Sequence, residues 1–185
     1  MGGSFDPIHY GHLAAAEAAL KRLAPAVVLF MPAAVSPDKT RGPRAPAAER
    51  LRMIELAAAE RPYFRVSGLE LRRGGSSFTA ETLRLLRALL PAPELWLAAG
   101  SDIIAGLPAW KEAETIRRLA RLVCVSRPGY PPVSPPGWEI VHIAAGTPDI
   151  SSSLIRARVR AGASLTGLTP AAVEKHITDK GLYRR

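Results

Sequence analysis

Short apolar runs alternate with helical patterns along the chain. Runs that favour buried strands stand at residues 27–31, 64–66, 94–99, 122–125 and 140–143. Helical periodicity is predicted at residues 13–23, 47–61, 76–90, 111–120, 151–160 and 170–178. Because strands and helices alternate, we predict an α/β fold with a doubly wound parallel sheet.

Ligands bind such sheets beyond the carboxyl ends of the strands. Three polar segments are expected there: residues 2–12, the turn at 100–102 and residues 151–156. We therefore expect these segments to converge on one cleft. The loop at 32–46 carries four prolines and several charges, which indicates a functional or mobile segment.

The opening segment carries the clearest chemical signal. His9 and His12 flank Gly11 at the start of a predicted helix, and Gly2 and Gly3 stand upstream. The first turn of a helix offers unpaired N–H groups and the positive end of the dipole, while glycine lets the backbone approach a ligand. This pattern predicts a phosphate-binding site, with a plain surface loop as the alternative.

One feature of this segment is irregular. A phosphate loop of this kind ordinarily follows a strand, yet only Met1 precedes Gly2. We therefore expect the first strand of the sheet to be missing from the chain.

Composition limits the alternatives. At 185 residues and 48% apolar content, the chain fits a single domain, 1–185. Cys124 is the only cysteine, so no disulfide can form within the chain and a reducing compartment is expected. Cys124 itself is expected to be a small core residue. His142 and His176 are the only other histidines, which disfavours a zinc site. The sequence shows neither the pattern of a leader peptide nor a long apolar run. We therefore expect a cytoplasmic protein with no membrane partner.

The formal net charge of +9 favours anionic partners such as nucleotides. The basic residues are spread along the chain and are not interleaved with aromatic residues. No nucleic-acid partner is therefore expected.

Two motifs carry a family resemblance. Gly3-Ser4-Phe5-Asp6-Pro7-x-His9-x-Gly11-His12 and Ile150-Ser151-Ser152-Ser153-x-x-Arg156 resemble the paired signature of the HxGH nucleotidyltransferase superfamily. Residues 77–82, 100–110 and 125–130, with the tail Gly181-Leu182-Tyr183, are similar to bacterial nicotinate-nucleotide adenylyltransferases.

The resemblance implies a Rossmann-like nucleotidyltransferase fold and an enzyme of NAD biosynthesis. Such an enzyme transfers AMP from ATP, supplied with Mg²⁺, to nicotinate mononucleotide and releases deamido-NAD and pyrophosphate. The attacking phosphate is already anionic, so the reaction needs positive charge and alignment more than a strong base.

The resemblance also implies residue roles. The catalytic set is His9, His12 and Arg156. The implied ATP-binding residues are Gly2, Gly3, Ser4, His9, His12, Ile150, Ser151, Ser152, Ser153 and Arg156. The implied substrate-binding residues are Ser4, Phe5, Lys39, Thr79, Gly100, Asp102, Trp110, Lys111 and Arg127.

Simpler roles exist for some of these residues. Helix capping would explain the three serines and Asp102, core packing would explain Trp110, and a solvated charge would explain Lys39. The chain also departs from the family pattern, because Asp38 stands where a histidine is usual, and Ser4 and Ser153 replace the more frequent threonine.

Three other functions remain open at this point. A related adenylyltransferase would act on nicotinamide mononucleotide or on phosphopantetheine, although Thr79 and Trp110 disfavour the latter. A non-catalytic nucleotide- or RNA-binding module would explain the charge, but would not require His9, His12 and Arg156 together. The sequence leaves homo-oligomer formation open.

Overall fold

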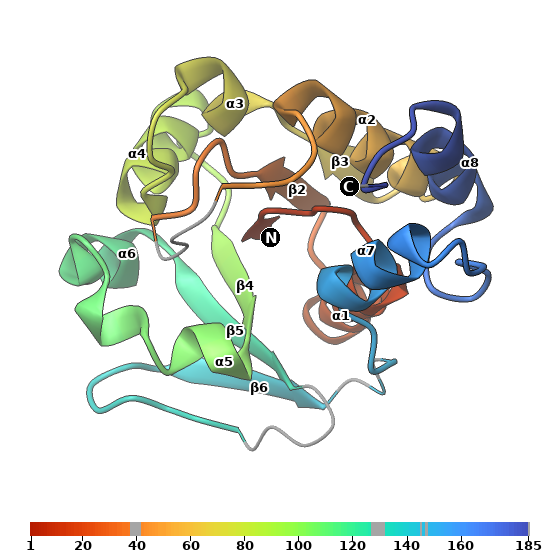
Figure 1. The fold of residues 1–185 in the computed structure, drawn as a ribbon. Coiled ribbons are helices and arrows are strands. Elements are labelled where there is room, and N and C mark those ends of the chain that lie inside the picture. The colour runs from red at the N-terminus through yellow and green to blue at the C-terminus, as the bar shows by residue number, and fades with distance from the viewer. Residues whose placement is uncertain (38–41, 127–131, 145, 147, 185) are drawn as a thin grey trace.

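The computed structural model contains two three-stranded sheets surrounded by helices (Figure 1). It describes residues 1–37, 42–126, 132–144, 146 and 148–184, without the side chain of Asp102. The strands are β1 (Gly2–Gly3), β2 (Val28–Pro32), β3 (Phe64–Val66), β4 (Trp96–Gly100), β5 (Arg121–Ser126) and β6 (Ile140–Ala144). The helices are α1 (Tyr10–Leu23), α2 (Ala47–Ala58), α3 (Leu69–Arg73), α4 (Thr79–Leu89), α5 (Ser101–Ile104), η1 (Leu107–Ala109), α6 (Ala113–Leu119), α7 (Ser152–Arg160) and α8 (Ala171–Asp179).

Both sheets are parallel, with the orders β1-β2-β3 and β4-β5-β6. Gly2 pairs with Met31 in the first sheet, and Trp96 pairs with Arg121 in the second. Strand β1 also lies against β4, which brings the two sheets together. The predicted α/β fold with parallel strands is confirmed.

The expectation of a missing first strand needs correction. Gly2 and Gly3 form β1 and pair in parallel with the end of β2. The N–H of Met31 donates to the carbonyl of Met1 (3.0 Å), and that of Ala33 donates to the carbonyl of Gly3 (2.9 Å). A strand of two glycines shows no hydrophobic alternation, so the sequence pattern could not reveal it.

Several element boundaries also differ from the prediction. Helix α1 begins at Tyr10 with His9 as its N-cap, so the histidine motif itself forms the helix start. Helix α2 ends at Ala58 rather than at residue 61. The turn expected at 100–102 is the junction of β4 with α5, and the five-residue α3 was not predicted.

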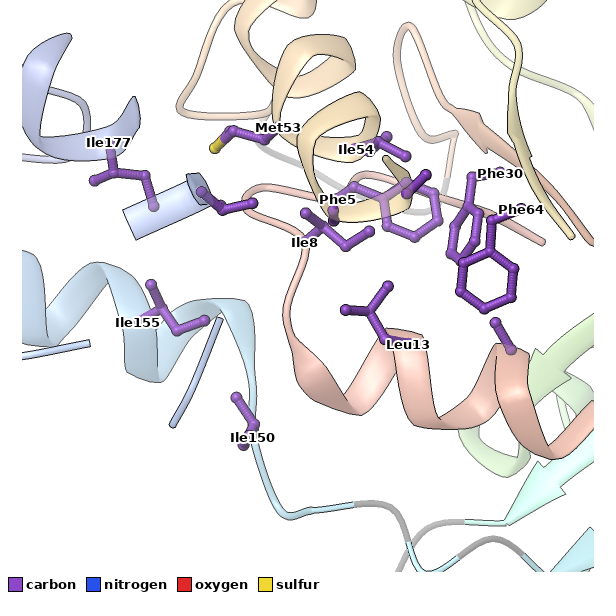
Figure 2. Close-up of a cluster of buried hydrophobic side chains, with 14 of the residues drawn as sticks. Phe5, Ile8, Leu13, Phe30, Met53, Ile54, Phe64, Ile150, Ile155 and Ile177 are labelled. Atoms are coloured by element: carbon purple, nitrogen blue, oxygen red, sulfur yellow. The ribbon is translucent and has the colours of Figure 1, made fainter. Parts of the chain in front are cut away.

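Two large apolar clusters support these elements. The first joins β2, β3, α1, α2, α7 and α8 around Phe5, Phe30 and Met53 (Figure 2). The second fills the space between α4, α6 and the β4–β5 pair. Cys124 belongs to this second cluster and is fully buried, as its predicted role as a core residue requires.

Within the described ranges, every helix is too short or too polar to cross a membrane.

Candidate active site

A cleft of about 870 Å³ opens where β1 and β4 end and α7 begins. Its lining comes from all three segments that were expected to converge, together with the start of α4 and residues 109–111. The predicted site residues that line it are Gly2, Gly3, Ser4, Phe5, His9, His12, Thr79, Gly100, Trp110, Lys111, Ser151, Ser152, Ser153 and Arg156.

Among the predicted site residues that the structure describes in full, Ile150 alone is outside that lining. Ile150 directly precedes the three serines in the sequence and is buried in the first apolar cluster. Lys39 and Arg127 lie outside the described residues, as does the side chain of Asp102.

The two motif histidines lie one against the other at the cleft. Their ring centroids are 3.7 Å apart, and the ring planes are tilted by 32°. The backbone N–H of His9 donates to Nδ1 of His12 (3.3 Å). A neutral imidazole that accepts at Nδ1 carries its hydrogen on Nε2. His12 is thereby set up as a hydrogen-bond donor through Nε2.

Glycine is needed at position 11 because of His9. A Cβ at Gly11 would lie 3.0 Å from Nδ1 and 3.1 Å from Cε1 of the His9 ring, which is too close for ordinary contact. A Cβ at Gly2 would meet nothing within 4 Å. Gly2 therefore leaves open space beside the cleft, whereas Gly11 makes room for the His9 ring.

The three serines at the start of α7 have separate structural roles. Ser151 Oγ accepts from the N–H of Leu154 (3.1 Å), so the capping role considered for it is present. Ser152 Oγ donates to the carbonyl of Pro7 (2.9 Å), which ties α7 to the opening loop. The start of α7 is thus fixed beside the histidines, with its first-turn N–H groups at the cleft.

Arg156 is held over the same loop. Its Nη1 donates to the carbonyl of Asp6 (2.7 Å), and its Nη2 donates to Ser153 Oγ (3.1 Å). Nη1 also lies 3.9 Å from Oδ2 of Asp6. By contrast, Arg158 is exposed and its Nε donates to the carbonyl of Ser164, away from the cleft. Of these two arginines, Arg156 lines the cleft and Arg158 does not.

Buried Asp6 and Arg50 were not assigned roles from the sequence. The Asp6 carboxylate, 5% exposed, accepts from the N–H groups of Arg44 (2.7 Å) and Ala45 (3.0 Å). Arg50, 1% exposed, donates from Nη1 to the carbonyls of Ser4 and Ala33, both at 2.8 Å. These two charged side chains therefore hold residues 33 and 44–45, which follow β2, against the loop at residues 4–6.

A sequence signal for Arg50 does exist. It occupies the face of α2 that carries Met53, Ile54 and Ala57, so it interrupts a buried apolar stripe with a charge. Burial lowers its pKa, and the negative charge of Asp6 opposes that effect. A charged residue at such a position requires a buried acceptor.

The far end of the cleft has a different character. Trp110 follows η1, is half-buried and also packs against the second apolar cluster, so the core-packing role applies in part. Lys111 Nζ lies 4.1 Å from the centre of the Phe78 ring and donates to Oε1 of Glu81 (3.1 Å). Thr79 begins α4 beside them. Aromatic side chains and a helix start therefore line the same cleft as the histidines.

Glu70 also lines the cleft and was not predicted. Its side chain is buried and accepts from Thr82 Oγ1 (2.7 Å). It lies on the short α3, whose five residues give no periodic pattern.

Comparison with known proteins places this chain in a family. Residues 1–158 match the family described as cytidylyltransferase-like. A relative from Thermus thermophilus, named "Probable nicotinate-nucleotide adenylyltransferase", is 46% identical over 184 residues, which are 100% of this chain and 97% of the relative. A relative of the same name from Dehalococcoides mccartyi is 41% identical over 195 residues, covering 100% and 96%.

Solved structures agree on the fold. The nicotinic acid mononucleotide adenylyltransferase of Plasmodium falciparum complexed with NaAD has a TM-score of 0.81 at 18% identity, covering 99% of this chain and 95% of that one. With APC bound, the same protein gives a TM-score of 0.77. With its paired motifs around one cleft and its full-length similarity to these relatives, the chain belongs to the nicotinate-nucleotide adenylyltransferase family.

Proposed function

We propose that this chain transfers AMP from ATP to nicotinate mononucleotide, acting as a single domain over residues 1–185. One observation carries the proposal: His9, His12 and Arg156 share a cleft with Thr79 and Trp110. Cationic and donor groups for phosphate and an aromatic side chain for a base thus line one cleft. The names of the relatives from Thermus and Dehalococcoides support the same reaction.

The reaction is a displacement at the α-phosphorus of ATP. A phosphate oxygen of nicotinate mononucleotide forms the new P–O bond, and the bond between the α-phosphorus and the bridging oxygen breaks. The electron pair leaves with pyrophosphate. Because negative groups must be aligned while charge moves to the leaving group, donors fixed in advance lower the barrier.

The proposed roles follow from the positions of the side chains. His12, with Nε2 as a donor, and the adjacent His9 stabilise the phosphate under attack. Arg156 and the first turn of α7 hold the leaving phosphates, with Gly2, Gly3 and Ser4 along the nucleotide.

The mononucleotide occupies the other end of the cleft. There Trp110 stacks on the pyridine ring, while Thr79 and the Lys111 backbone donate to the carboxylate. The Lys111 ammonium is paired with Glu81, so the backbone and the helix start are the main donors. Lys39, Asp102 and Arg127 remain predicted contacts.

Mg²⁺ belongs to the nucleotide in this proposal. The described residues hold no group of three His, Cys, Asp or Glu side chains that could form a metal cage. Apart from Asp6, whose carboxylate already accepts from Arg44, Ala45 and Tyr183, the residues near the proposed phosphate positions are donors and cations, which suit phosphate oxygens rather than a metal ion. The metal is therefore expected to arrive bound to the triphosphate.

The decisive measurement is pyrophosphate release from ATP and Mg²⁺. Nicotinate mononucleotide, nicotinamide mononucleotide and phosphopantetheine are supplied separately, and release is expected with the first. No release with any acceptor would disprove the enzymatic role. Preference for the amide would disprove the assigned substrate.

Replacing His12 by Ala tests the catalytic role directly. Turnover should fall at least ~10²-fold, because a donor to the developing charge is removed. The matched control is His142→Ala, since His142 is an exposed histidine on β6 and does not line the cleft. An unchanged rate in the His12 variant would remove this residue from the mechanism.

A further inference from the structure

The C-terminal segment reaches the active-site loop through one buried hydroxyl. Tyr183, 8% exposed, donates from its phenol oxygen to Oδ1 of Asp6 at 2.8 Å. The two residues are 177 positions apart in the sequence. The tail resembled the family pattern in the sequence, but the proposed reaction gives it no role.

The backbone around Tyr183 is arranged to bring the phenol inward. After α8, the N–H of Leu182 donates to the carbonyl of Ile177 (3.0 Å), which turns the chain back. Tyr183 itself has φ of 64°, a left-handed conformation that an aromatic residue seldom adopts. Such a conformation costs free energy and persists where surrounding contacts require it.

The phenol is a reliable donor in this position. Burial and the negative charge of Asp6 raise the pKa of Tyr183 above its usual value, so the hydroxyl keeps its proton. Oδ1 of Asp6 therefore has two donors, the Tyr183 hydroxyl and the N–H of Ala45. These two hydrogen bonds fix the orientation of the Asp6 carboxylate.

The orientation of Asp6 sets two features of the cleft. Oδ2 accepts from the N–H of Arg44 (2.7 Å), and Arg44 lies on the cleft rim. Oδ2 also lies 3.9 Å from Nη1 of Arg156, which donates to the carbonyl of the same Asp6 (2.7 Å). A rotation of this carboxylate would therefore move a rim amide and an arginine of the proposed phosphate site together.

We propose that Tyr183 is a positioning residue for AMP transfer, acting through the Asp6 carboxylate on Arg156 and on the backbone amides of Arg44 and Ala45. This inference rests on the proposed function. Tyr183 touches no reacting atom, so its effect is on alignment. Misplacement of a charged group by about 1 Å can cost up to ~10²-fold in rate.

The test compares Tyr183→Phe with Ile177→Val. The first variant removes the hydroxyl and keeps the ring, while the second trims a buried aliphatic side chain of α8 in the same apolar cluster and removes no hydrogen-bonding group. Both are assayed at a temperature where melting curves show them fully folded. Pyrophosphate release gives kcat and the KM for ATP, and NMR-detected hydrogen exchange follows the amides of Arg44 and Ala45.

Tyr183→Phe should lower kcat about tenfold and change the KM for ATP less than about twofold. Exchange at Arg44 and Ala45 should become faster, while the amides of β5 keep their protection. Ile177→Val should leave kcat and the Arg44 and Ala45 exchange rates unchanged. Asp6→Asn should show larger changes of the same kind, and if it does not fold, Tyr183→Phe alone decides.

Equal kcat and equal exchange in the two main variants would overturn the proposal. Faster exchange with unchanged kcat would overturn it too. The relay, meaning the contacts from Tyr183 through Asp6 to Arg44 and Arg156, would then have no catalytic consequence. If the wild-type protein releases no pyrophosphate with any acceptor, the proposed function fails. In that case the positioning role in AMP transfer is overturned with it, and the exchange rates show whether the relay itself exists.

Discussion

Charged side chains enter the interior of the half built on β1, β2 and β3, whereas the buried polar side chains described in the half built on β4, β5 and β6, such as Ser101 and Thr115, are uncharged. The described residues that are both charged and buried are Asp6, Arg50 and Glu70, and all three lie in or against the first half. In the second half, the pairs Arg84–Glu112, Arg117–Glu114 and Arg121–Glu94 lie on the surface.

The difference reflects what each half must hold. The first half supports irregular loops, whose carbonyls and N–H groups have no strand or helix partner, and buried charged groups satisfy them. The second half presents Thr79 and Trp110 from the ends of regular elements, for which apolar packing suffices. Substitutions of charged residues should therefore be costly in the first half and mild in the second.

The largest effect is expected for Arg50→Met. The substitution leaves the carbonyls of Ser4 and Ala33 without their buried donor and removes a charge that compensates Asp6. The free energy of unfolding should fall by about 3 kcal/mol or more. Denaturant unfolding measures this, with Arg84→Met as the matched surface control. A loss equal to that of the control would contradict the contrast between the halves.

Gly11→Ala separates stability from activity within the first half. Alanine favours a helix interior over glycine, so the melting temperature should not fall greatly. The new Cβ would press on the His9 ring, which must shift, and kcat should fall roughly tenfold. Steady-state kinetics and thermal melting check the two expectations. A fully active variant would show that the spacing around His9 is not critical.

Trp110→Ala tests the second half at the cleft. Loss of a stacking surface should raise the KM for nicotinate mononucleotide about fivefold, since aromatic pairs contribute about 0.5–1.5 kcal/mol. The KM for ATP should change little, because the proposed function assigns Trp110 to the pyridine ring of the mononucleotide and not to ATP. Initial rates at varied concentrations of each substrate distinguish the two. Equal changes in both KM values would point to a packing role alone.

The smallest effect is expected for Glu112→Gln on the surface. Hydrogen bonding from Arg84 lowers the pKa of Glu112, so any stability from this pair is present above the ordinary value near 4.5 and is lost as the pH falls through the lowered pKa. Because both side chains are solvated, the melting temperature at neutral pH should drop by less than about 2 °C. A larger drop would show that surface pairs also hold the second half together.

The sequence predicted most of the regular elements because their periodicity is local. Residues 64–66 were predicted with the bounds that β3 has, and the capped helix start at Ser151 was found. The two-residue β1 and the five-residue α3 were not predicted, because elements this short show no periodic pattern of apolar residues. Both motif halves of the candidate site were also visible, since each is a short contiguous pattern.

The network behind those motifs was not visible. Asp6 bonds partners 38, 39 and 177 residues away, and nothing in the spacing of these residues indicates their pairing. The sequence by itself determined most of the elements, the parallel α/β fold and the two motifs at the cleft, because local periodicity and short motifs encode them. Only the tertiary structure decided which contacts fix the shape of the cleft, because the partners of a buried charge are the groups that folding brings close to it.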